Sequence, residues 1–133
     1  MELTQVDIDQ CTRTQKTYVH RLGIAETYAH RVGITEIHYT EGVHLVATKG
    51  KAFWLLAAIL SYQNSPVIKQ TELKDFQLWE LNVSENKTAV LTCRIDDDLP
   101  PLISQKIAIT DFPLPYLRLI YFSDVLRLFS ECK

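Results

Sequence analysis

The spacing of the apolar residues changes at Pro66, and this change constrains the fold more than any other feature of the sequence. Before Pro66, apolar residues recur with the period of a helix or fill a short segment completely, as in Ala52–Leu60. After it, side chains alternate along the chain, as in Phe76–Val83. The first pattern is typical of helices and the second of strands. The sequence therefore predicts helices followed by strands, which is an α+β fold.

A single domain is expected for residues 1–133, because a chain of this length normally builds one hydrophobic core. Residues 1–66 are predicted to be mainly helical, and residues 67–133 to form strands joined by short links. Consecutive strands with short links pair in antiparallel fashion. The predicted architecture is a set of N-terminal helices packed on one face of a four- to five-stranded antiparallel sheet.

Three helices are predicted in the first half of the chain. Thr4 can cap a short helix, and Thr40 can cap a longer one that ends at Gly50. A glycine in this position suggests a left-handed stop. The segment Lys51–Gln63 follows, and because it is apolar on every side we expect it to be the buried central helix.

The strands are predicted from alternation and from the turns between them. Ser123 and Asp124 mark a two-residue hairpin between the last two strands. The predicted strands span residues 76–83, 88–95, 103–109, 117–122 and 125–129. The residues expected to be buried are Trp54, Leu55, Ile59, Trp79, Leu91, Ile107 and Leu119.

Charge and cysteine content exclude several classes of protein. Fourteen lysines and arginines against sixteen acidic residues give a net charge of −2, which excludes a polybasic nucleic-acid binder and an acidic tail. Three cysteines without a Cys-x-x-Cys pair do not form a disulfide framework. The N-terminus lacks a secretion signal, and no apolar run is long enough to span a bilayer. We therefore expect a reduced cytoplasmic protein that does not enter a membrane.

A tandem repeat occupies residues 17–36. Thr17–Glu26 is followed directly by Thr27–Glu36, and seven of the ten positions are identical. A local duplication that lengthens a loop or strand explains this best. Tyrosine and arginine are enriched at interface hot spots. If the protein binds a partner or a second copy of itself, the predicted contact residues are Tyr18, Arg21, Tyr28 and Arg31.

A metal-dependent hydrolase is the first alternative. All four histidines lie early in the chain, and Glu41 and His44 fall on the same face of a predicted helix. Imidazole and carboxylate groups bind zinc and similar ions. The spacing matches no zinc signature such as His-Glu-x-x-His. The candidate ligands under this hypothesis are His20, His30, His38, Glu41 and His44.

A DNA-binding helix-turn-helix is the second alternative, since Ala29–Gly33 resembles the turn of such a motif. A recognition helix after Gly33 would carry Glu36 and Glu41 and few cations, whereas DNA affinity depends on lysine and arginine. Nucleic acid is therefore not an expected partner. The sequence also lacks Gly-x-Ser-x-Gly and a glycine-rich phosphate loop, so no cofactor is predicted. These observations favour a non-enzymatic binding module.

Four phrases and the closing hairpin carry a resemblance to a known family. The phrases are Tyr39-Thr-Glu-Gly-Val43, Phe53-Trp-Leu-Leu56, Phe76-Gln-Leu-Trp-Glu-Leu81 and Thr110-Asp-Phe-Pro-Leu114, and the hairpin runs into Ser130-Glu131. In this order they resemble an uncharacterised family of small bacterial and phage proteins, a domain of unknown function. The resemblance implies a bacterial context but no reaction, ligand or catalytic residue.

Overall fold

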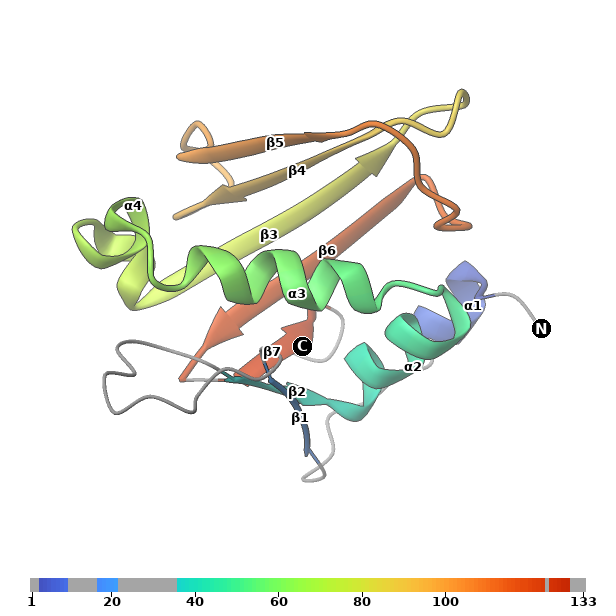
Figure 1. The fold of residues 1–133 in the computed structure, drawn as a ribbon, viewed down its shortest axis with the longest axis horizontal. Coiled ribbons are helices and arrows are strands. Elements are labelled where there is room, and N and C mark those ends of the chain that lie inside the picture. Colours follow the sequence, from blue (N-terminus) through green and yellow to red (C-terminus); the bar gives the residue numbers. More distant parts are fainter. Residues whose placement is uncertain (1–2, 10–16, 22–35, 124, 130–133) are drawn as a thin grey trace.

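The computed structural model of the chain describes residues 3–9, 17–21, 36–123 and 125–129 (Figure 1). Along these residues a short helix and two strands come first, then a group of helices, and then five strands. In chain order they are α1 Gln5–Asp9, β1 Thr17–Arg21, β2 Glu36–Thr40, α2 Glu41–Lys49, α3 Phe53–Tyr62, α4 Pro66–Lys69, the 3-10 helix η1 Glu72–Lys74, β3 Phe76–Val83, β4 Ala89–Arg94, β5 Ile103–Ile107, β6 Tyr116–Phe122 and β7 Val125–Leu128. The fold is α+β, as predicted.

The described strands form one seven-stranded sheet in the order β1-β2-β7-β6-β3-β4-β5. Every neighbouring pair is antiparallel except β2 and β7, which are parallel. The prediction of a four- to five-stranded antiparallel sheet is therefore wrong in two respects. The sheet contains two further strands from the N-terminal half, and the return of β2 beside β7 makes it mixed.

The two additional strands come from the repeat and the residues after it. β1 pairs with β2 from Thr17 opposite Thr40 to Arg21 opposite Glu36. Tyr and β-branched residues are common in strands, and both segments contain them. The prediction that residues 1–66 are mainly helical missed these two strands, because each is only five residues long and too short for its alternation to stand out.

The turn between α2 and α3 confirms one prediction and corrects another. Thr40 caps α2, and its hydroxyl accepts a hydrogen bond from the Val43 N–H at 3.4 Å. Gly50 ends α2 with φ −89°, so the left-handed stop is wrong. A Cβ at Gly50 would lie 2.6 Å from the Val46 carbonyl oxygen and 2.8 Å from a ring carbon of Phe112. Gly50 is therefore required by close packing, and the positive φ of 54° falls on Lys51.

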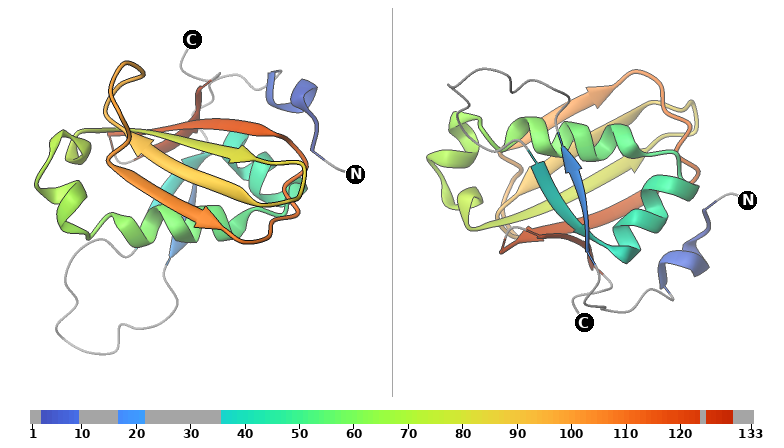
Figure 2. Two further views of the ribbon diagram at one scale, coloured as in Figure 1. Left: turned by 90° about the horizontal axis from the view of Figure 1, so that it is seen from above. Right: turned by 60° about the horizontal axis from the view of Figure 1, so that its bottom comes forward.

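The core lies between the sheet and the helices α2 and α3, which lie on one face of it (Figures 1 and 2). Leu55, Ile59, Trp79, Leu91 and Leu119 are buried, as predicted. Two predictions are wrong, since Trp54 and Ile107 are only partly buried. Trp54 lies in the first turn of α3, and Ile107 ends the outermost strand β5, so each faces the rim of the core.

The short helices α4 and η1, between α3 and β3, are absent from the sequence-based prediction.

None of the helices within residues 3–9, 36–123 and 125–129 has the length and apolar character that crossing a membrane requires.

Candidate functional site

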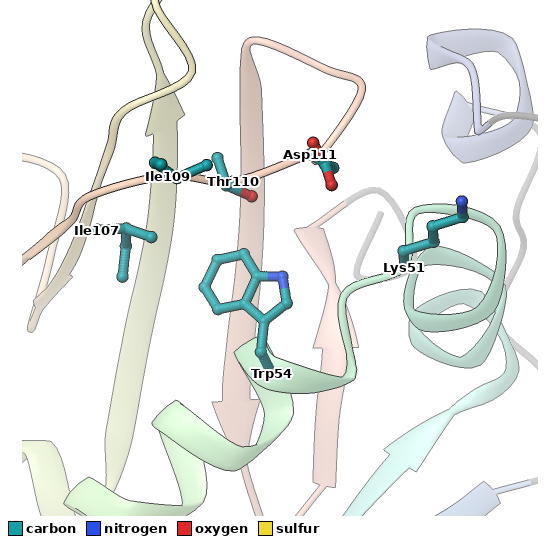
Figure 3. Close-up of a pocket in the computed structure, with 6 residues that line it drawn as sticks. All are labelled: Lys51, Trp54, Ile107, Ile109, Thr110 and Asp111. Atoms are coloured by element: carbon teal, nitrogen blue, oxygen red, sulfur yellow. The ribbon is translucent and has the colours of Figure 1, made fainter.

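A pocket of about 370 Å³ opens between the start of α3 and the chain that follows β5 (Figure 3). We call it the Trp54 pocket. Its lining comes from two segments that lie far apart in the sequence and meet only in the fold. The lining residues are Lys51, Trp54, Ile107, Ile109, Thr110 and Asp111.

Hydrogen bonds and packing fix the position of the segment after β5. The Thr110 N–H donates to the Lys87 carbonyl oxygen at 2.8 Å, which ties this segment to the turn between β3 and β4. The Thr110 hydroxyl accepts a hydrogen bond from the Phe112 N–H at 3.1 Å. Phe112 is buried and packs closely against Gly50, just before Lys51. Both walls of the pocket are therefore anchored to the core.

The chemistry of the pocket is an apolar wall with a charged rim. The Trp54 ring lies beneath Ile109 and Thr110, with Ile107 on one side (Figure 3). Ile109 is 77% exposed, so a large aliphatic side chain is open to solvent beside the tryptophan. Lys51 and Asp111 are exposed and add one charge of each sign. Apolar walls with a few polar groups are typical of ligand-binding pockets.

The pocket lies at one end of a seam between α3 and β5. Trp54, Ala58 and Tyr62 are spaced by one helical turn and are half-buried on the same side of α3. Tyr62 donates a hydrogen bond from its hydroxyl to the Gln105 side-chain carbonyl of β5 at 2.8 Å. At the other end of β5, Ile107 lines the Trp54 pocket. The side of α3 that carries Tyr62, Ala58 and Trp54 therefore runs along β5, from Gln105 to the Trp54 pocket.

A second cluster of functional groups lies on the opposite face of the sheet. We call it the Glu80 cluster. Glu80 is buried, and its carboxylate oxygens lie 3.1 Å from Arg94 Nε and 3.0 Å from Arg118 Nη2. The Tyr116 hydroxyl donates to the same carboxylate. Arg118 also pairs with Asp97 at 2.8 Å. Each arginine therefore already has a carboxylate partner within the chain.

The ionisation of Glu80 follows from this surrounding. Burial alone would raise the pKa of Glu80, but the hydrogen bonds from Tyr116 and Arg118 and the charges of Arg94 and Arg118 outweigh it. The pKa of Glu80 therefore lies below its ordinary value. Burial and the hydrogen bond to Glu80 raise the pKa of Tyr116. Near neutral pH the cluster holds a carboxylate and a neutral phenol, which is a stable structural arrangement.

The predicted contact residues fall largely outside the described part of the chain. Tyr18 and Arg21 belong to β1, of which the backbone alone is described. Tyr28 and Arg31 lie outside the described residues. The prediction that these four side chains form a contact surface therefore stays a prediction.

The metal hypothesis can be examined for three of its five residues. His38 lies in β2, and Glu41 and His44 lie in α2. The His44 ring stacks on Tyr39 with ring centroids 6.0 Å apart. Within the ranges that the structure describes, no three His, Cys, Asp or Glu side chains are placed to hold one ion. The His20 side chain and His30 are not described, so a site that includes them stays a prediction.

The helix-turn-helix hypothesis is wrong where it can be compared with the structure. Glu36–Thr40 is a strand, paired with β1 on one side and β7 on the other. A recognition helix that begins after Gly33 would need these residues. The strand is favoured because Ile37 and Tyr39 alternate into the core.

Sequence reasoning missed the Trp54 pocket. Trp54 was expected inside the core, and Lys51, Thr110 and Asp111 were not predicted to be site residues. One local signal was available, because the predicted strand 103–109 ends on the apolar Ile109 and is followed by a polar Thr-Asp pair. The proximity of Lys51 to Asp111 depends on tertiary packing, which single-sequence patterns do not report.

Comparison with known proteins gives one match. A family of unknown function, DUF6876, matches residues 3–132. No curated protein and no solved structure matches the chain. The match agrees with the resemblance to an uncharacterised family, and it carries no reaction, ligand or partner.

Proposed function

The chain belongs to DUF6876, a family of unknown function, and we propose that it is a non-enzymatic binding module that holds an apolar side chain of a protein partner in the Trp54 pocket. The observation that carries this proposal is the exposed Ile109 beside the half-buried Trp54 at an anchored pocket. Covering such a pair removes apolar area from water, which is the main favourable term in association.

The charged rim supports a protein partner. Lys51 and Asp111 stand beside the apolar wall, and among the described residues no salt bridge joins one to the other. A polar rim around an apolar centre is the usual composition of a protein interface. A polypeptide offers apolar side chains together with amide and charged groups, so it matches this mixture.

The setting of the proposal comes from the sequence. A small bacterial protein of the cytoplasm, with an unknown protein partner or a second copy of itself, is the proposed context. Its near-neutral charge argues against nucleic acid as the partner. The repeat residues Tyr18, Arg21, Tyr28 and Arg31 are proposed as a further contact surface.

A selection from a random-peptide phage library on the immobilised full chain tests the function. Peptides that survive are synthesised and titrated against the wild type and against Trp54→Ala. We expect the dissociation constant to rise by at least about tenfold in Trp54→Ala, as is typical of a hot-spot aromatic. Phe53→Ala is the matched control, because Phe53 is the adjacent exposed aromatic and does not line the pocket.

Fluorescence provides a direct readout of the same binding event. The chain has two tryptophans, and Trp79 is fully buried in the core. A ligand in the pocket should therefore change the emission of Trp54 alone, and Trp54→Phe should abolish the change. Selected peptides that bind Trp54→Ala as tightly as the wild type would contradict the proposed function.

A further inference from the structure

The free edge of β5 adjoins the Trp54 pocket. β5 is the last strand of the sheet, hydrogen-bonded to β4 on one side and to no strand of the described residues on the other. An edge strand presents unpaired N–H and C=O groups, which another extended chain can satisfy. Ile107 belongs both to this edge strand and to the lining of the pocket.

The direction of the backbone groups of β5 follows from the neighbouring ladder. The Ser84 N–H donates to the Thr88 carbonyl oxygen at 2.8 Å, where β3 and β4 meet. In an antiparallel pair, alternate residues bond to opposite sides. Even-numbered residues of β4 therefore bond toward β3, and odd-numbered ones toward β5. Gln105 pairs with Leu91, so its backbone groups point at β4.

The residues on either side of Gln105 must then point the other way. The N–H and C=O groups of Ser104 and Lys106 face the open edge of the sheet, two residues apart. This spacing is the one that an added strand needs to form a ladder. The edge therefore offers an extended peptide four backbone hydrogen-bonding groups beside the pocket.

Side-chain alternation places one residue of an added strand in the pocket. The side chains of Gln105 and Ile107 lie on the same face of the sheet as α3. A residue opposite Ile107 in a neighbouring strand would project its side chain to that same face. Because Ile107 lines the pocket together with Trp54 and Ile109, an apolar side chain is favoured at this position.

Lys106 adds a charge preference on the other face. Its side chain is exposed and has no carboxylate partner among the residues that the structure describes. An opposite charge directly across from it in an added strand is favourable. The residue of the partner next to the apolar one, opposite Lys106, is therefore expected to be Asp or Glu.

A second copy of the chain fits this edge less well. If β5 pairs with itself about a two-fold axis at Gln105, then Ile103 of the second copy lies opposite Ile107. Ile103 is only 6% exposed within its own core and cannot enter the pocket. The sequence of β5, Ile-Ser-Gln-Lys-Ile, also contains no carboxylate for Lys106.

We infer that the partner binds as an extended peptide that adds a strand to the free edge of β5, with an apolar side chain in the Trp54 pocket and an acidic residue opposite Lys106. This inference rests on the proposed function and specifies how the partner is recognised. Main-chain hydrogen bonds would give affinity, and the pocket would give specificity, as in other cases of strand addition.

Two variants at one position test the strand addition. Lys106→Pro removes an N–H that points at the open edge, and proline is tolerated at such positions of edge strands. Lys106→Ala removes the charge and keeps the N–H. With a peptide selected on the wild type, we expect Lys106→Pro to raise the dissociation constant by at least about tenfold and Lys106→Ala by about threefold. Thermal melting of both variants checks that each is folded.

A matched change in the peptide removes any dependence on the folding of the variants. Peptides that carry an N-methyl group at each backbone nitrogen in turn are titrated against the unaltered chain. Strand addition predicts that binding is lost at alternate positions, because only every second N–H faces β5. Methylation that has no alternating effect would overturn the inference.

The outcomes separate this inference from the function on which it rests. If Trp54→Ala weakens binding while Lys106→Pro behaves like Lys106→Ala, the pocket binds the peptide without strand addition, and the inference is overturned. If Trp54→Ala has no effect on peptide binding, the proposed function itself is overturned, and with it the inference that rests on it. Light scattering that shows a dimer of the wild type and a monomer of Lys106→Pro would assign the edge to a second copy, which also overturns the inference.

Discussion

The two faces of the sheet differ in what lies against them. On one face, α2 and α3 cover an apolar core that includes Trp79 and Leu91. On the other, Leu78 and Ile120 are 3% and 7% exposed although they are not part of that core. There Arg118 lies 4.8 Å from the ring centroid of Phe129, and the ring centroids of Phe76 and Phe122 lie 6.3 Å apart.

This difference between the two faces indicates where a ligand can bind. The Glu80 cluster pairs each of its arginines with a carboxylate, so a new partner would have to break interactions that already exist. The helical face leaves Ile109 exposed and the edge of β5 unpaired within the described residues. Binding of a partner is therefore most favourable where apolar surface is exposed and backbone groups are unpaired, and not where charges are already paired.

The largest expected effect is on the covered face. Trp79 is fully buried, and its indole N–H donates to the Gln77 side chain at 2.8 Å. Gln77 in turn exchanges hydrogen bonds with Gln63 at 2.8 and 2.9 Å. We expect Trp79→Ala to lower the free energy of unfolding by about 3–5 kcal/mol, through lost burial and the cavity left behind. Urea denaturation measures it, and a loss below that of Trp54→Ala would show that the core has been misassigned.

A smaller effect is expected on the opposite face. Glu80→Ala leaves Arg94, Arg118 and Tyr116 without their shared carboxylate. Because both arginines keep some access to water, we expect the free energy of unfolding to fall by about 1–3 kcal/mol. The same denaturation experiment measures it, with the exposed Glu85→Ala as the matched control. Equal stabilities of the two variants would mean that the Glu80 cluster contributes little.

Trp54→Ala should cost less than Trp79→Ala although the residue type is the same. Trp54 is only half-buried at the rim of the pocket, so part of its surface already contacts water. We expect a loss of about 1–2 kcal/mol in the free energy of unfolding, together with the loss of peptide binding. Binding that falls without any change in stability would contradict the expected stability loss and would make Trp54 a purely functional residue.

The smallest effect is a dependence of stability on pH. The pKa of Glu80 is lower in the folded chain than its ordinary value, so the folded state favours the ionised carboxylate. Its stabilisation is complete above the ordinary carboxyl range and is lost as the pH falls through the lowered pKa. Unfolding free energies measured for wild type and Glu80→Gln should therefore converge in acid. Curves that stay parallel from neutral to acidic pH would contradict the assigned pKa direction.

Local signals allowed much of the fold to be predicted. β3 spans Phe76–Val83 as the alternation indicated, and Thr40 caps α2 as its residue type indicated. Features that depend on contacts between distant parts of the chain could not be predicted. The parallel pairing of β2 with β7 joins residues such as His38 and Val125, and no local pattern encodes that contact.

The candidate site shows the same division. The sequence predicts Trp54 in the core, because an all-apolar helix does not show which of its turns lies at the rim. The role of Gly50 was assigned to backbone conformation, whereas its cause is the approach of Phe112 from far along the chain. Lys51 and Asp111 meet at the pocket only because that approach brings their segments together.

One measurement tests the central claim that binding takes place on the helical side and at the β5 edge. An ¹⁵N-labelled sample of the full chain is titrated with a peptide selected on the wild type, and the shifted NMR signals are mapped on the two faces. We expect the signals of the Trp54 indole and of the backbone amides of Ser104 and Lys106 to move most. Shifts confined to Arg118, Phe129 and the other residues around Glu80 would contradict it and assign the binding surface to the opposite face.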